Sequence, residues 1–404
     1  MNKDLKLAII KEGKTPPDMR VPLTPKQCVE VQEKFPNIDL SVQSSQVRIF
    51  KDTEYSDLGL PVNDEVNDAD VLIGVKEVPI DMLVADKTYF FFSHTTKEQP
   101  YNRDLLRAIL DKNIRLIDYE GLTNAGGTRL IGFGYYAGIV GAYNGIMAWG
   151  KRHKSFDLCP ALELTSLEDM AHELKKVQLP AIKIALTGGG RVAKGVLDVM
   201  AMLGLKKVSA EDYLRESYDQ PVYTQLFVDD YNKRKDGEVK SRSDFYTNYK
   251  EYDSNFFRFA RVTDLYIAGH FYAEESPFIF TREEAKHPEF KIQVVADISC
   301  DIDGPVASTL RPSTIADPLY GYMASSESET NYDNMDAITV MAVDNLPCEL
   351  PSAASEGFGN EMIQHILPQL LNNDAEGILE RATIAKDGQL TEHHQYLQNY
   401  VDGK

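Results

Sequence analysis

A glycine-rich turn between an apolar strand and an apolar helix constrains this chain more than any other feature. Residues 182–187 (IKIALT) are typical of a buried strand, G-x-G-x-x-A follows at 188–193, and an apolar-periodic helix is predicted over 192–203. Glycines there allow a tight turn and bring a pyrophosphate close to the free amides of the helix N-terminus. A dinucleotide site is favoured over an ordinary strand–helix turn. Its predicted residues are Gly188, Gly189, Gly190, Arg191, Val192 and Ala193.

An acidic residue stands at a suitable distance beyond this turn. Glu211 follows Gly190 by about 20 residues, the spacing at which a carboxylate accepts hydrogen bonds from ribose hydroxyls. It would repel a 2′-phosphate, which favours NAD over NADP. Two alternatives stay open, because Glu211 and Asp212 also suit a solvated turn and Arg191 or Arg215 could reach a phosphate. The cofactor is therefore predicted as NAD or NADP, with NAD slightly favoured.

Short apolar, β-branched or aromatic runs recur along the chain and are typical of buried strands. Amphipathic stretches separate them, and this alternation implies parallel sheets with helices on both faces. The predicted fold class is α/β, doubly wound. Strands are predicted at 5–10, 71–76, 88–94, 114–120, 182–188, 265–270, 292–299 and 338–345, and helices at 24–35, 103–112, 166–177 and 192–203.

A long uncharged segment lies near the expected domain boundary. Residues 131–150 carry no charge and match the length of a membrane span. Gly134, Gly138, Gly141 and Gly145 recur along one helix face, however, which lets another backbone approach closely. A buried interdomain helix is favoured over a membrane anchor. A chain of 404 residues accommodates two domains, and the charged, tyrosine-rich stretch 211–261 is predicted as an insertion of surface helices and loop.

The charge balance limits the classes of partner. The net charge of −19 disfavours nucleic acid and anionic lipid, so we expect neither nucleic acid nor a membrane as a partner. The four cysteines are far apart and form neither CxxC nor a Cys/His cluster, so no metal site is predicted. The first ten residues lack the apolar region of a signal peptide, and a cytoplasmic location is expected by default.

Two predicted strands end in titratable residues. Lys76 closes the run VLIGVK and His94 closes YFFFSH. The carboxyl ends of strands border the ligand crevice in open α/β sheets, and partial desolvation brings a lysine pKa towards neutrality, where histidine already titrates. The two residues therefore suit general acid–base work. Neighbouring loops add positions suited to a substrate with several carboxylates: Lys14, Arg20, Lys97, Gln99 and Arg129.

Several distinctive segments occur in a familiar order along essentially the whole chain. They are KTYFFFSHT, IRLIDYE, GFGYYAGIVGA, GGGRVAKG, DISCD and VDNLPCELP, the last followed by Glu356. The chain resembles the lysine-ketoglutarate reductase domain of aminoadipate semialdehyde synthases and, more distantly, fungal saccharopine dehydrogenases. Both lie within the superfamily of alanine dehydrogenase and transhydrogenase.

The resemblance implies two Rossmann-like domains joined by long helices, with the active site in the interdomain cleft. The substrate domain would comprise 1–132 and 345–404, and the dinucleotide domain 133–344. The implied reaction joins lysine and 2-oxoglutarate as saccharopine with NAD(P)-linked hydride transfer and small-molecule substrates only. Lys76 and His94 would share the proton transfers, and Asp301 would lie near the cofactor. Arg20, Lys97, Gln99, Glu120 and Arg129 look like substrate or proton-network positions.

The chain also departs from these families. Asp18 stands where the fungal enzymes have glutamate, and the reductases typically use NADP although Glu211 favours NAD. An alanine dehydrogenase or other opine-type dehydrogenase is the alternative enzyme, and a non-catalytic dinucleotide-binding sensor is the alternative of another class. The oligomeric state, the physiological direction and the role of 211–261 are left open.

Overall fold

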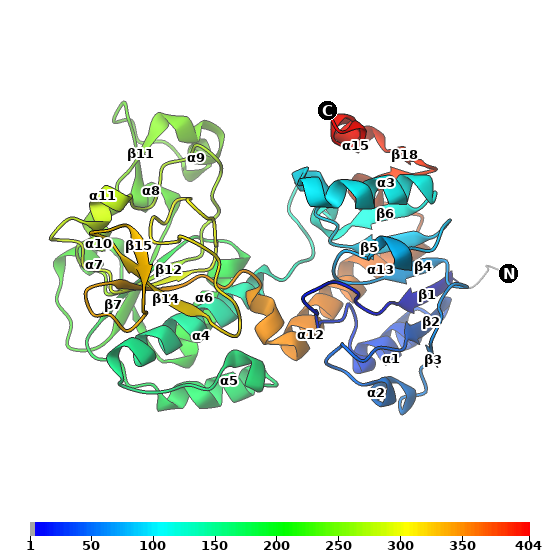
Figure 1. The fold of residues 1–404 in the computed structure, drawn as a ribbon, viewed down its shortest axis with the longest axis horizontal. Coiled ribbons are helices and arrows are strands. Elements are labelled where there is room, and N and C mark those ends of the chain that lie inside the picture. The colour runs from blue at the N-terminus through cyan, green and yellow to red at the C-terminus, as the bar shows by residue number, and fades with distance from the viewer. Residues whose placement is uncertain (1–4) are drawn as a thin grey trace. The chain divides into compact units, whose positions relative to one another are not determined.

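The computed structural model describes residues 5–404, which form two compact units (Figure 1). Unit 1 runs to Phe133 and resumes with Pro351–Lys404, and unit 2 is Gly134–Leu350. Each unit contains one eight-stranded sheet. The sequence predicted that the chain returns from the second unit to the first between residues 344 and 345. In the structure it returns between Leu350 and Pro351.

Unit 1 is an α/β layer structure whose N-terminal strands run parallel and whose last two strands run antiparallel. Its strands are β1 (Leu5–Ile9), β2 (Ile38–Gln43), β3 (Val62–Asn63), β4 (Val71–Ile73), β5 (Thr88–Phe91), β6 (Arg115–Asp118), β17 (Thr383–Lys386) and β18 (Gln389–Leu390). Its α-helices are α1 (Pro25–Lys34), α2 (Asp52–Ser56), α3 (Arg103–Asp111), α12 (Pro351–Glu361), α13 (Leu367–Leu371), α14 (Ile378–Ala382) and α15 (Gln398–Asp402).

The strand order in unit 1 is β18-β17-β6-β5-β4-β1-β2-β3. The chain therefore adds β2 and β3 on one side of β1, and then adds β4, β5 and β6 in turn on the other side. Alternate residues of β1 face opposite sides, as the period of a strand requires. Leu7 and Ile9 join one core cluster and Ala8 joins the other.

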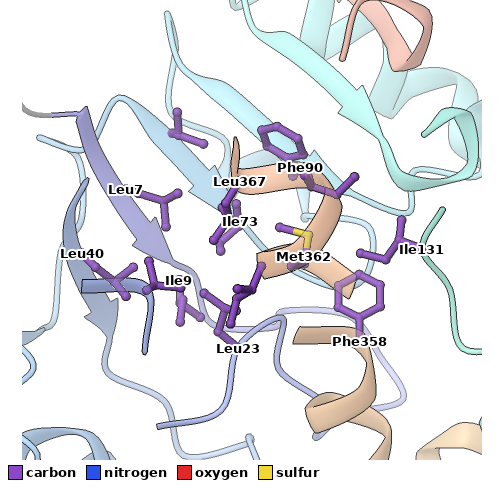
Figure 2. Packing of buried hydrophobic residues seen from close by; sticks show 14 of the residues in the cluster. Leu7, Ile9, Leu23, Leu40, Ile73, Phe90, Ile131, Phe358, Met362 and Leu367 are labelled. Atoms are coloured by element: carbon purple, nitrogen blue, oxygen red, sulfur yellow. The ribbon is translucent and has the colours of Figure 1, made fainter. Parts of the chain in front are cut away.

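The C-terminal segment completes the core of unit 1. Figure 2 shows Phe358, Met362 and Leu367 beside Ile73 and Phe90 of the sheet. All five side chains are buried, and burying each apolar side chain of this size stabilises the fold by roughly 1.5–3 kcal/mol. The last part of the chain therefore belongs to the same structural unit as the first.

Unit 2 is also an α/β structure, with its central strands parallel and an antiparallel pair at one end. Its sheet contains β7 (Lys183–Thr187), β8 (Lys206–Lys207), β9 (Val222–Leu226), β12 (Leu265–Ala268), β13 (Val294–Asp297), β14 (Leu319–Met323), β15 (Ser328–Thr330) and β16 (Ile338–Met341), and β10 (Asn232–Arg234) pairs with β11 (Tyr252–Ser254). Its α-helices are α4 (Gly134–His153), α5 (Leu167–Glu173), α6 (Arg191–Met202), α7 (Ala210–Arg215), α8 (Val228–Tyr231), α9 (Arg242–Asn248), α10 (Phe257–Ala260) and α11 (Arg282–Ala285).

The strand order in unit 2 is β15-β14-β16-β13-β12-β7-β9-β8. Each predicted strand and helix is present, and most of the strands are shorter than expected because their last residues turn into loops. The α/β class is thereby confirmed.

The prediction for 211–261 is wrong in one respect. Val222–Leu226 is not surface loop: it forms β9, which pairs directly with β7 inside the sheet. Tyr213, Phe256 and Phe259 from the same stretch are fully buried in the core of unit 2. Charged residues surround this short strand in the sequence and obscured it. Its pairing with β7 and β8 in the sheet identifies it.

The glycine stripe of 131–150 brings α4 close to its neighbours. A Cβ at Gly138 would lie 1.9 Å from the carbonyl oxygen of Val192 on α6, and one at Gly195 would lie 2.1 Å from that of Tyr135. The prediction of a buried helix is confirmed: α4 begins at Gly134 and is buried from Gly138 to Gly150. Among residues 5–404, no helix has the length and apolarity that a membrane crossing requires.

A local contact explains why unit 2 extends to Leu350. The 3₁₀ turn η8 (Leu346–Glu349) packs on α4, where the Asn144 side-chain amide donates to Glu349 Oε1 at 2.9 Å. Both side chains are buried. This contact keeps 345–350 with unit 2 instead of unit 1.

We expect Gly138→Ala to lower the free energy of unfolding of unit 2 by about 1–3 kcal/mol, because a backbone carbonyl occupies the space of the new methyl group. Urea unfolding followed by fluorescence of Trp149, the single tryptophan, would measure it. Gly134→Ala is the matched control, since its Cβ would make an ordinary contact 3.5 Å from Arg191, and alanine favours a helix by about 1 kcal/mol. Equal midpoints for Gly138→Ala and the wild type would contradict this packing.

Glu349 provides a pH-dependent test of the same core. Burial raises its pKa from 4.5 to about 7, although the hydrogen bond from Asn144 lowers it. The folded state therefore holds the proton more tightly, so stability falls as pH rises between these values. Glu349→Gln removes that loss and should exceed the wild type in stability by up to about 3 kcal/mol at pH 8, with little difference at pH 5. The same difference at both pH values, measured by Trp149 fluorescence in urea, would contradict it.

Candidate active site

The carboxyl ends of β1 and β4 form the point in unit 1 where the strand order reverses. Connections leave these two strands in opposite directions, and ligands of open α/β sheets bind at such a point. The loop after β1 carries Glu12, Lys14, Asp18 and Arg20, and Lys76 follows β4. The sheet topology thus brings three of the predicted basic residues, Lys14, Arg20 and Lys76, to one edge.

Glu12 fixes the turn that presents Lys76. Its two carboxylate oxygens accept from the backbone amides of Val75 at 2.7 Å and Lys76 at 2.9 Å. Burial raises the pKa of Glu12 to about 7, against the effect of these hydrogen bonds. Burial also lowers the pKa of Lys76, and Arg20 and Lys14 nearby lower it further. The surroundings of Lys76 therefore shift its equilibrium towards the neutral amine, the form that accepts a proton, although Asp18 and Glu77 oppose the shift.

Glu77 joins two of the predicted residues. Its Oε1 lies 2.7 Å from His94 Nδ1, and its Oε2 lies 2.8 Å from Lys14 Nζ. Burial opposes the charge, yet hydrogen bonds from His94 and Lys14 lower the pKa of Glu77 to about 2. A carboxylate accepts only, so Nδ1 carries a hydrogen and Nε2 is the nitrogen left for proton exchange with a ligand.

The backbone of His94 also marks this position. His94 has φ of 53°, in the left-handed region that residues other than glycine seldom adopt. Its ring lies parallel to that of Phe92, with centroids 6.3 Å apart. The Glu77 hydrogen bond and this ring contact hold the imidazole in a single orientation.

Arg20 is held by the carboxylate of Asp18. Its Nε and Nη2 donate to the two Asp18 oxygens at 3.0 and 2.6 Å, and its guanidinium lies 4.1 Å from the centroid of Phe133. Both charged side chains are buried, at 2–3% exposure. Burial opposes ionisation of Asp18, but Arg20 lowers its pKa overall. The pair holds the Arg20 guanidinium near Lys76. Asp18, which stands where the fungal enzymes have glutamate, still provides a carboxylate for Arg20.

The remaining predicted residues of unit 1 fall into separate places. Lys97 Nζ lies 3.9 Å from Glu120 Oε1, at the ends of β5 and β6. Gln99 interacts with Tyr101 through its side chain and accepts from the Tyr400 hydroxyl through its backbone carbonyl. Arg129 is exposed and its backbone bridges to Thr123.

Sequence reasoning missed Glu12 and Glu77, the two carboxylates that organise this site. Glu77 directly follows Lys76, so its place at a strand end was a usable signal. Glu12 carried no such signal, because its loop contacts the β4 turn only after the chain has folded.

In unit 2, the glycine turn lies where the strand order reverses between β7 and β12. Gly188 has φ of 115°, and a Cβ there would lie 2.3 Å from the Gly269 carbonyl oxygen. Gly190 precedes the first turn of α6, which contains Arg191, Val192 and Ala193, and a Cβ on Gly190 would meet nothing within 4 Å. The turn therefore leaves room above the free amides of α6, as a pyrophosphate requires.

His270 adds a polar group beside this turn. It follows Gly269, its Nδ1 lies 3.0 Å from Thr187 Oγ1, and burial lowers its pKa to about 4. Within residues 5–404, its buried Nε2 has no hydrogen-bond partner. A neutral imidazole with an unmatched nitrogen at this edge fits a site that a polar ligand completes.

Asp301 lies after β13, on the same edge of the sheet, and burial followed by the charge of Asp297 raises its pKa. Asp297 itself accepts from Ser299 and Thr309. In the described part of the chain, no group of three or more His, Cys, Asp or Glu side chains is arranged to hold a metal ion.

The structure places Glu211 away from the strand beside the glycine turn. It lies in the first turn of α7, pairs with Arg215, and has a side chain 68% exposed. The preceding strand, β8, pairs with β9 and not with β7. The spacing rule assumed that the next strand in sequence is also the neighbour in the sheet, which does not hold in this chain.

Comparison with known proteins defines the class of fold. Residues 8–140 match the family described as alanine dehydrogenase/PNT, N-terminal domain. A solved L-alanine dehydrogenase superposes with a TM-score of 0.64 at 15% identity, covering 99% of both chains. The prediction of two Rossmann-like units is confirmed.

Matches to curated sequences are more specific. The chain is 28% identical to rat alpha-aminoadipic semialdehyde synthase, over 98% of this chain and 48% of that protein. It is 23% identical to the saccharopine dehydrogenase [NAD(+), L-lysine-forming] of Yarrowia lipolytica, over 95% of this chain and 96% of that one. The chain thus spans about half the length of the synthases and nearly all of the dehydrogenase. The resemblance carried by the motifs is confirmed.

Proposed function

We propose that this chain is a nicotinamide-dependent amino-acid oxidoreductase that interconverts lysine plus 2-oxoglutarate and saccharopine. The observation that carries the proposal is the group in which Glu77 binds His94 and Lys14 beside a desolvated Lys76. The similarity of the chain to a saccharopine dehydrogenase and to an alpha-aminoadipic semialdehyde synthase supports the choice of substrate.

In the reductive direction, the side-chain amine of lysine must lose a proton before it attacks the ketone carbon of 2-oxoglutarate. Lys76 suits this role, because burial favours its neutral form. The resulting carbinolamine loses its hydroxyl as water only when that oxygen is protonated. His94 in its doubly protonated form can donate the Nε2 proton and return to the neutral imidazole, since Glu77 holds Nδ1–H throughout.

The substrate carboxylates require cations at the same edge. Arg20 and Lys14 lie near Lys76, and Lys97, Gln99, Glu120 and Arg129 remain proposed substrate or network positions. Gly188, Gly189, Gly190, Arg191, Val192 and Ala193, with Asp301 nearby, would hold the dinucleotide, which would supply the hydride for the reduction. The proposed partners are these small molecules alone, and the cytoplasmic location remains a prediction because the rat relative is named mitochondrial.

The test of this function is an assay of the purified chain with lysine and 2-oxoglutarate, with NADH and NADPH supplied in parallel. We expect lysine-dependent oxidation of the reduced dinucleotide that saturates with both substrates. Ammonia plus pyruvate is the comparison, because the match of 8–140 to the alanine dehydrogenase/PNT family favours alanine dehydrogenase as the second candidate. Turnover with ammonia plus pyruvate alone would replace the proposed substrate.

Lys76→Met and His94→Gln should each lower turnover by about 10²–10⁴-fold while leaving dinucleotide affinity unchanged, because general acid–base catalysis contributes that much. Glu77→Gln should cause a smaller loss, since it keeps one hydrogen bond to His94 but not the charge. Initial rates and dinucleotide fluorescence titrations would measure the two effects separately. Unchanged turnover in Lys76→Met and His94→Gln would contradict these roles, and a wild type that binds dinucleotide without turnover would favour the sensor.

A further inference from the structure

We propose that Asp118 is a positioning residue of the active site: its carboxylate holds the turn that carries His94, so that the imidazole meets the substrate in one orientation. This inference rests on the role of His94 in the proposed function. Asp118 is the last residue of β6 and pairs with Phe91 near the end of β5. It is 1% exposed, so it acts through the residues that it binds and not on the substrate.

His94 stands in a backbone conformation that needs support from its surroundings. Its φ of 53° lies in the left-handed region, and a residue other than glycine keeps such a conformation only where the structure around it holds it there. A 3₁₀ turn, η2 (Thr95–Lys97), follows directly. The contacts that fix the residues on either side of His94 therefore decide where the imidazole points.

The carboxylate of Asp118 binds the residue before His94 twice. Its Oδ2 accepts from the backbone amide of Ser93 at 2.8 Å and also from the Ser93 hydroxyl. Because that hydroxyl gives its proton to Asp118, its lone pairs accept from Thr95, from the backbone amide at 3.2 Å and from the hydroxyl at 2.8 Å. All three side chains of this network are buried. One carboxylate thus ties together the residues that precede and follow His94.

Asp118 also fixes the start of the next turn at this edge of the sheet. Its Oδ1 accepts from the backbone amide of Glu120 at 2.7 Å. The Glu120 carboxylate lies 3.5 Å from the Thr96 hydroxyl and 3.9 Å from Lys97 Nζ. The Asp118 carboxylate therefore joins the ends of β5 and β6, which carry His94, Lys97 and Glu120 of the proposed site.

The test measures kcat and KM for Ser93→Ala and Asp118→Asn in the assay with lysine and 2-oxoglutarate. Ser93→Ala cuts the link from Asp118 to Thr95, and an amide at position 118 cannot accept from all three donors. We expect each variant to lower kcat by about 10²-fold, the cost of misplacing a catalytic group by about 1 Å. KM should change little, because Asp18 and Glu77 hold the substrate-binding cations. Ser93→Ala, the smaller change, carries the test if Asp118→Asn does not fold.

A double-mutant cycle separates positioning from a loss of stability. In a His94→Gln background, Ser93→Ala should lower kcat little further, because the imidazole through which it acts is already absent. Ile117→Val is the matched control, since it leaves a small cavity in the same buried strand and should lower the urea midpoint with kcat unchanged. The full loss repeated in the His94→Gln background, or wild-type kcat in both Ser93→Ala and Asp118→Asn, would overturn the inference.

Further outcomes distinguish this inference from the proposed function. Turnover with ammonia plus pyruvate alone would overturn the proposed substrate, and a loss of kcat in Ser93→Ala in that assay would still support the role of Asp118. Lysine-dependent turnover that survives both Ser93→Ala and Asp118→Asn would overturn the inference and leave the proposed function intact. A wild type without turnover in either assay, or an unchanged kcat in His94→Gln, would overturn both the proposed role of His94 and the inference.

Discussion

Each sheet reverses its strand order beside its first strand, and both candidate sites depend on that reversal. Parallel strands require crossover connections over the faces of the sheet, so the chain leaves β1 and β4, or β7 and β12, in opposite directions. Loops follow the strands at this point and border the candidate sites. In unit 1 those loops carry Glu12, Lys14 and Arg20, and in unit 2 they carry Gly188 and His270.

Charge at the unit 1 site is arranged against the average of the chain. The net charge is −19, yet Lys14 and Arg20 lie close enough to Lys76 for their charges to lower its pKa. Such a cluster would be costly in a partly buried site without compensation. Glu77 and Asp18 supply it through direct ion pairs. These carboxylates keep the cations in place, while Lys76 lies beside them with its pKa lowered by burial.

Much of this arrangement could be predicted from local patterns. Apolar runs located the strands, and the residues that close these runs pointed to Lys76 and His94, because a buried parallel strand ends where its continuous apolar run gives way to polar residues. Glu12 could not be found in this way, since its partners are backbone amides more than 60 residues away along the chain. The strand at 222–226 was also missed, because charged neighbours hide a run whose burial is created by the adjoining strands.

The sequence by itself determined the α/β class, the glycine turn and the uncharged helix, because periodicity, glycine and the absence of charge act over neighbouring residues. Only the tertiary structure decided that Glu211 does not follow the strand beside the turn. Glu211 has the expected spacing, but β8 is an edge strand and β9 occupies the place beside β7. Strand order is set by burial and hydrogen bonding between distant segments, so a count along the chain cannot supply it.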